Sequence, residues 1–93
     1  MKELNQLLHS QLRLAIMSIL MSVDEADFVY LKEKTESTAG NLSVQLDKLS
    51  SAGYIRVIKG MSGKRPRTTC SVTPDGRAAF EEYVNSLRSY LNL

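Results

Sequence analysis

The chain has 93 residues, of which 43% are hydrophobic and 24% charged, as is typical of one globular domain with a modest core. Its single cysteine excludes an internal disulfide, and one cysteine with one histidine excludes a structural zinc cluster. No apolar run approaches the roughly 18 residues that cross a bilayer, and no signal peptide pattern is present. We therefore expect one domain over residues 1–93, a cytoplasmic location, and neither metal nor cofactor.

The net charge of +2 conceals an asymmetry along the chain. Residues 1–53 carry five basic and seven acidic side chains, whereas residues 54–93 carry seven basic and three acidic ones. Four of the basic residues, Lys59, Lys64, Arg65 and Arg67, lie within nine positions that contain no acid. Basic charge gathered on one segment predicts a polyanionic partner.

Apolar residues spaced by three and four predict a helix over residues 4–21. An alternative divides this segment near His9, with Ser10 as the cap of a second helix. Asp24 is expected to begin the next, short helix, with Asp27 three positions on; both residues suit a helix N-terminus. This helix would bury Phe28 and Leu31.

Thr38 is a suitable N-cap for a third helix that runs to about residue 52. Leu42, Leu46 and Leu49 share one face of it, and Gly53 suits the left-handed residue that ends a helix.

Residues 54–59 and 68–73 are rich in β-branched side chains and alternate in polarity, which predicts an antiparallel hairpin. The intervening segment, with Gly60, Gly63 and Pro66, is expected to be a long, flexible, basic loop. Thr73 followed by Pro74 predicts the start of a final helix. The expected fold is mainly α with a small antiparallel β-hairpin, a winged helix-turn-helix in the order α-α-α-β-β-α.

Several segments together form a pattern over residues 8–88: Leu8–Ile16, Ala26–Phe28, Gly40–Ser43, Ala52–Ile55, Gly63–Thr69 and Val72–Arg77. This pattern resembles winged-helix regulators related to the MarR and ArsR families, and its most specific part is the segment Gly63–Thr69. The resemblance implies a dimeric transcription regulator that binds double-stranded DNA. It also implies that the N- and C-terminal helices form the dimer contact.

In such a fold the third helix (38–52) enters the major groove, and the hairpin, or wing (59–69), contacts phosphates or the minor groove. Asn41 has the groups for a bidentate pair with adenine, and Val44 stands where related regulators often carry arginine. Asp47 would repel phosphate, which leaves more of the affinity to the wing. The predicted DNA-binding residues are Thr38, Gly40, Asn41, Ser43, Val44, Gln45, Lys48, Lys64, Arg65, Arg67 and Thr68.

Apolar residues at both ends of the chain exceed what one core face requires, which predicts a homodimer. The predicted dimer-interface residues are Leu4, Leu7, Leu8, Leu14, Met17, Tyr83, Leu87, Tyr90 and Leu91. A further hypothesis, which adds to DNA binding rather than replacing it, is an unknown small-molecule effector bound between the subunits. No membrane partner is expected.

Nothing in the sequence supports catalysis. No serine or cysteine nucleophile has a plausible base, and His9 is expected at a helix surface or an interface rather than as a ligand. Cys70 is expected to be a small buried core residue rather than a redox sensor. The alternative function is a winged-helix module that binds an acidic protein partner through the wing, because the predicted recognition helix is poor in positive charge.

Overall fold

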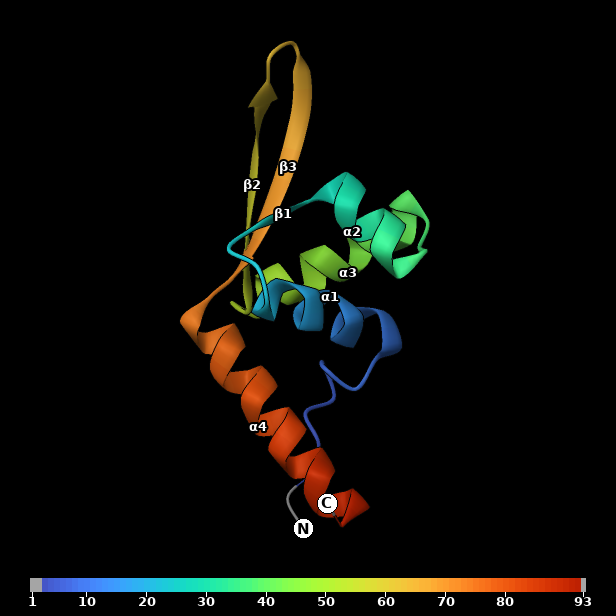
Figure 1. The fold of residues 1–93 in the computed structure, drawn as a ribbon, viewed down its shortest axis with the longest axis vertical. Helices are drawn as coiled ribbons and strands as arrows, with labels where there is room; N and C mark the ends of the chain where they lie inside the picture. The colour runs from blue at the N-terminus through green and yellow to red at the C-terminus, as the bar shows by residue number, and fades with distance from the viewer. Residues whose placement is uncertain (1–2, 93) are drawn as a thin grey trace.

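The first three helices pack together, and a three-stranded sheet extends from one side of them (Figure 1). The computed structural model describes residues 3–92. Its mainly α architecture with a wing-like hairpin confirms the predicted fold class, although one short strand was not predicted. The elements are α1 (Gln11–Met21), β1 (Ala26–Asp27), α2 (Phe28–Thr35), α3 (Ala39–Ser51), β2 (Ile55–Ser62), β3 (Arg65–Val72) and α4 (Pro74–Leu91).

The core lies among these helices and the inner ends of the strands. All three leucines predicted to face inward from α3 are buried there, with exposed fractions of at most 3%. The buried cluster comprises Leu8, Ile16, Met17, Leu20, Ala26, Leu31, Leu42, Leu46, Leu49, Ile55, Cys70 and Tyr83.

The N-terminal helix begins later than the continuous helix predicted over residues 4–21. Helix α1 starts at Gln11 after the N-cap Ser10, which confirms the predicted break near His9, but the residues before it form a turn rather than a first helix. The side chain of Ser10 makes no capping hydrogen bond. Before it, Asn5 Oδ1 accepts bonds from the backbone N–H groups of Leu7 and Leu8 at 2.9 and 3.3 Å. This turn competes with helix formation because a short amide side chain satisfies local backbone donors.

The prediction that Asp24 begins the second helix is wrong. Residues Ala26 and Asp27 form the two-residue strand β1, and Asp27 is the N-cap of α2. Its carboxylate accepts a bond from the N–H of Tyr30 at 2.8 Å. The helix ends at Glu36 in a left-handed conformation, with a φ of 53°.

Helix α3 has the ends that were predicted. Thr38 Oγ1 accepts a bond from the N–H of Asn41 at 3.1 Å, which satisfies one of the free donors of the first turn. The cap at the other end is Ala52, and Gly53 follows with a φ of +78°. The positive φ explains the glycine, since other residues adopt this region at a cost.

The two strands of the wing are longer than predicted, and the loop that joins them is shorter. Strands β2 and β3 pair continuously from Ile55↔Val72 to Ser62↔Arg65, so the predicted long flexible loop is wrong. Only Gly63 and Lys64 connect the strands, and Gly63 has the positive φ (+63°) that a two-residue hairpin turn requires. Pro66 is compatible with β3 because β1 pairs only with Thr69 and Cys70, which leaves the outer side of Pro66 without a strand.

Strand β1 attaches the wing to the helices. It pairs antiparallel with β3, with Ala26 opposite Cys70 and Asp27 opposite Thr69, so the sheet order is β1-β3-β2. Because Asp27 is also the cap of α2, one residue connects the sheet with the start of that helix.

Helix α4 starts from a tightly packed junction with the base of the wing. Thr73 Oγ1 caps the N–H of Gly76 at 3.0 Å, and it also donates to the carbonyl oxygen of Gly53 at 2.6 Å. A Cβ on Gly76 would lie 2.0 Å from the carbonyl oxygen of Tyr54, so no larger residue fits without a backbone shift. From this junction α4 extends away from the tip of the wing (Figure 1). Within residues 3–92, none of the helices combines the length and apolarity that crossing a membrane requires.

Candidate nucleic-acid interface

Helix α3 presents an outer face and two flanks, and its predicted DNA-binding residues are divided among them. Gly40, Val44 and Lys48 are exposed on the side away from the buried leucines, with Val44 49% exposed. Asn41 and Gln45 lie on the flank towards α1, whereas Ser43 lies on the flank towards the wing. The predicted residues of α3 therefore lie on its outer face and on two separate flanks rather than on one uniform surface.

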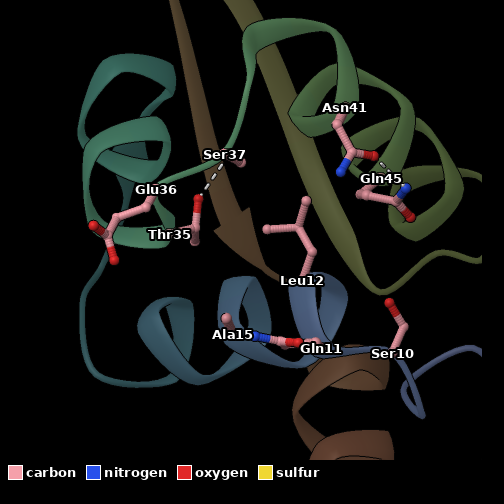
Figure 2. A pocket seen from close by; sticks show the side chains of 9 residues that line it. All are labelled: Ser10, Gln11, Leu12, Ala15, Thr35, Glu36, Ser37, Asn41 and Gln45. Carbon is pink, nitrogen blue, oxygen red and sulfur yellow. Dashed lines mark hydrogen bonds between the residues drawn. The ribbon is translucent and has the colours of Figure 1, made fainter.

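The flank towards α1 forms one side of a cleft of about 400 Å³ (Figure 2). The start of α1 and the turn between α2 and α3 form the other sides. Gln45 Nε2 donates to Asn41 Oδ1 across one helical turn at 2.9 Å. Thr38 is exposed on the same turn, but its hydroxyl oxygen already serves as the cap of α3. The cleft is lined by Ser10, Gln11, Leu12, Ala15, Thr35, Glu36, Ser37, Asn41 and Gln45.

The opposite flank of α3 faces the wing across a groove of about 300 Å³. This groove brings Ser43 of α3 and Thr68 of β3 together, two residues that were predicted separately. Asp47 of α3 and Lys59 of β2 line it as well, so its charge is mixed. The groove is lined by Phe28, Ser43, Leu46, Asp47, Val57, Lys59 and Thr68.

The wing holds its basic side chains outside the core. Every residue from Lys59 to Arg67 is exposed, and Lys64 lies in the turn itself. Among residues 3–92 no ion pair involves Lys64 or Arg65, so both charges face solvent. Charge placed this way is available to a polyanion.

Arg67 differs from its neighbours because it meets an acid of its own chain. One of its terminal nitrogens lies 3.7 Å from Asp27 Oδ2, in a pair whose side chains are 50% and 32% exposed. Arg67 therefore differs from Lys64 and Arg65 in having an acidic partner, and its contact with DNA stays a prediction. An exposed pair of this kind is worth roughly 0–1 kcal/mol, so the contact restrains Arg67 only weakly.

Three of the residues predicted for the dimer interface belong to the interior of the subunit instead. Leu8 and Met17 have no exposed surface, and Tyr83 is 4% exposed. Tyr83 is also bonded through its hydroxyl to His9 Nδ1 at 2.9 Å, so His9 joins the N-terminal segment to α4. The other predicted interface residues retain exposed surface in the subunit: Leu4, Leu7, Leu14, Leu87, Tyr90 and Leu91.

Cys70 is the buried core residue that was predicted. It is 1% exposed in β3, and burial raises the pKa of its thiol to about 11. A thiol that stays protonated and enclosed is a poor nucleophile. The described part of the chain contains no cluster of three or more His, Cys, Asp or Glu side chains that could hold a metal ion.

Two residues with clear roles near this surface were not predicted. Asp27 caps α2 and pairs with Arg67, and Arg13 of α1 donates a hydrogen bond to the side chain of Gln45 in α3. The only sequence feature that pointed to Asp27 was the preference of aspartate for helix starts. Asp24 has the same preference, and the start of the helix was predicted there. Nothing in the spacing of α1 distinguishes Arg13 from a solvated basic residue.

Comparison with known proteins places this chain in a family. A model described as a winged helix DNA-binding domain matches residues 12–91. An uncharacterized protein of Methanocaldococcus jannaschii is 34% identical over 79 residues, which cover 85% of this chain and 86% of that protein.

Solved structures show the same arrangement. A transcriptional regulator homologue from Pyrococcus horikoshii superposes with a TM-score of 0.88 and 26% identity, covering 95% of this chain and 87% of that one. The transcriptional regulator BldR of Sulfolobus solfataricus gives a TM-score of 0.75 at 26% identity, covering 89% of this chain and 58% of BldR. Regulators of the MarR and ArsR families share the fold, as the sequence resemblance implied. The chain belongs to the winged helix DNA-binding domain family.

Proposed function

We propose that this protein is a transcription regulator that binds double-stranded DNA, with α3 in the major groove and the wing on phosphates or the minor groove. The observation that carries the proposal is the placement of Lys64 in the turn of the wing and Arg65 at the start of β3, neither with an ion pair among residues 3–92, on a hairpin that flanks α3. The major groove of B-DNA admits an α-helix, and a neighbouring cationic hairpin gives affinity that does not depend on sequence.

The distribution of charge supports a division of roles between the two elements. The outer face of α3 carries Lys48 but also has Asp47 on its wing-side flank, so the helix itself contributes little net positive charge. Affinity from phosphate contacts then comes mainly from the wing, and discrimination between bases comes from the polar residues of α3.

The proposal includes a homodimer built from the two ends of the chain. The first described residues and the end of α4 lie together at the end of the molecule opposite the wing tip (Figure 1). Leu91 is 57% exposed there, and Leu4 and Leu87 are partly exposed. A second copy of the chain that covered these side chains would remove apolar surface from water. The two α3 helices of such a dimer would then face the two half-sites of a DNA operator. Sedimentation at micromolar concentration tests this, and a monomer would contradict it.

The salt dependence of DNA binding tests the proposal as a whole. The logarithm of the affinity for duplex DNA should fall linearly with the logarithm of salt concentration, by about 0.9 for each phosphate contact. Replacing Lys64 and Arg65 with alanine should reduce the slope by up to about 1.8 for each bound wing. Arg67→Ala should reduce it by less, because this cation is already partly neutralised by Asp27.

A control variant removes charge far from the tip of the wing. Arg77→Ala with Arg88→Ala takes two cations from α4 and should leave the slope close to that of the unaltered protein. An unchanged slope in the wing variant would remove the wing from the DNA surface. It would favour the alternative, a module that binds an acidic protein.

A further inference from the structure

Arg13 of α1 connects three parts of the molecule through hydrogen bonds. Its Nε donates to the carbonyl oxygen of Leu7 at 2.5 Å, and one terminal nitrogen donates to Gln45 Oε1 in α3. Gln45 Nε2 in turn donates to Asn41 Oδ1 at 2.9 Å. A continuous relay therefore runs from the N-terminal segment to the first turn of α3.

The direction of every bond in this relay follows from the chemistry of Arg13. A guanidinium group has five donors and no acceptor, so the atom of Gln45 that faces it must be the oxygen. The amide nitrogen of Gln45 then faces Asn41, and Asn41 must present its oxygen to that nitrogen. One donor-only side chain thus fixes the orientation of two amides that would otherwise be free to rotate by half a turn.

The outward-facing group of Asn41 is consequently a donor. In Figure 2 its oxygen is directed to Gln45, and its nitrogen points away from Gln45 into the cleft. Asn41 is exposed, and among residues 3–92 no hydrogen bond to its side-chain nitrogen is found. Two N–H groups are therefore presented at the edge of α3, beside the surface proposed to bind DNA.

We propose that Arg13 is a positioning residue for DNA recognition, which sets the Asn41 amide so that it donates to an acceptor atom of the bound DNA. The proposal rests on the function proposed above and makes it more specific. The acceptor is a base edge, such as guanine O6 or N7 or thymine O4, or it is a phosphate oxygen. A bidentate pair with adenine, the contact first expected for Asn41, would require its oxygen to accept a second hydrogen bond besides the one from Gln45.

The charge of Arg13 has a separate effect that the test must isolate. Arg13 is half-buried behind α3, and within the described residues it has no acidic partner. Its positive charge attracts DNA whether or not the relay exists. Arg13→Lys keeps that charge but replaces the planar fork with a single ammonium group, which is not shaped to hold both acceptors.

The decisive variant is Gln45→Glu. A carboxylate at position 45 still accepts from Arg13, but it has no N–H to offer Asn41. Asn41 should then turn its nitrogen towards Glu and its oxygen outward, which reverses the polarity presented to DNA. Ser50→Glu adds the same charge at an exposed position of α3 outside the relay and serves as the matched control.

Selection of bound sites from a random duplex pool, followed by affinity measurements on the selected sites, gives the outcome. If Asn41 contacts a base, Gln45→Glu should change the preference at one position per half-site, from an acceptor-bearing to a donor-bearing base. Arg13→Lys should weaken the preference at that position. In both variants the ratio of affinities between the two bases should change by about 2- to 10-fold, as expected for one hydrogen bond. If Asn41 contacts a phosphate, both variants should lose affinity uniformly, and Gln45→Glu should lose 2- to 10-fold more than Ser50→Glu.

Two results separate failure of the relay from failure of the function. Binding by the unaltered protein, with Gln45→Glu indistinguishable from Ser50→Glu, would overturn the role of Arg13 and leave the regulator intact. No binding of any duplex by the unaltered protein at low salt would overturn the proposed function itself. Side-chain amide NMR provides a measurement without DNA, since Arg13→Lys should speed hydrogen exchange of the Gln45 amide, and unchanged exchange would contradict the relay.

Discussion

Helix α3 is held by three buried leucines, whereas every residue of the wing from Lys59 to Arg67 is exposed. The two elements face a common groove but are stabilised in different ways. The position of α3 depends on side-chain packing and on a cap, while the outer wing depends on backbone pairing between two strands. A surface can therefore combine an element of fixed position with one that projects charge beyond the core.

Removal of a core contact should produce the largest difference between the two elements. Leu49→Ala should lower the free energy of unfolding by about 2–5 kcal/mol, because it leaves a cavity beneath α3. Met61→Ala removes a side chain that is 65% exposed near the wing tip, so its effect should stay within about 0.5 kcal/mol. Urea unfolding measures both values. A Met61 effect as large as that of Leu49 would place the wing tip in the cooperative core.

A smaller effect is expected where the base of the wing meets α4. Gly76→Ala should cost about 1–3 kcal/mol, because the new Cβ would force the Tyr54 carbonyl to move. Gly60→Ala in β2 is the matched control, since a Cβ there meets no atom within 4 Å. It should be neutral or stabilising by about 0.5–1 kcal/mol. Equal losses in the two variants, measured by thermal unfolding, would contradict the tight junction.

The smallest expected effect depends on pH and concerns the inner end of β3. Burial raises the pKa of Cys70 from 9.0 to about 11, so the folded protein keeps a proton that the unfolded chain loses. The unfolded state binds fewer protons between pH 9 and 11, and the free energy of unfolding should fall as pH rises through this window. By pH 10 the thiol should account for roughly 1 kcal/mol of that decrease.

Cys70→Ala provides the comparison for this measurement. Its unfolding free energy should depend less steeply on pH between 9 and 11, because the titrating thiol is gone while the other groups remain. The slope, rather than the absolute stability, carries the information, since alanine also changes packing. Parallel slopes for the two proteins would show that the thiol ionises as easily in the folded state as in the unfolded one.

Features governed by neighbouring residues were predictable. The leucine spacing of α3, its Thr38 cap, the left-handed Gly53 and the Thr73 cap of α4 all follow from interactions within a few positions. Local patterns failed at Asp24 and Asp27, because both suit a helix N-terminus and only pairing with β3 identifies Asp27 as the cap. They also failed at the wing, where strand pairing continues through residues of low β propensity.

The sequence by itself determined the order of the helices and the two long strands, the buried face of α3 and the concentration of positive charge on the hairpin, because periodicity and composition are local properties. Only the tertiary structure decided that Arg67 meets Asp27, that Leu8 and Met17 lie inside the subunit, and that Arg13 reaches Gln45. The two contacts join residues that are 32 and 40 positions apart, and the burial of Leu8 and Met17 depends on how several elements enclose their side chains. Their geometry is set by the packing of α1, α3 and the sheet as a whole, which no short stretch of sequence encodes.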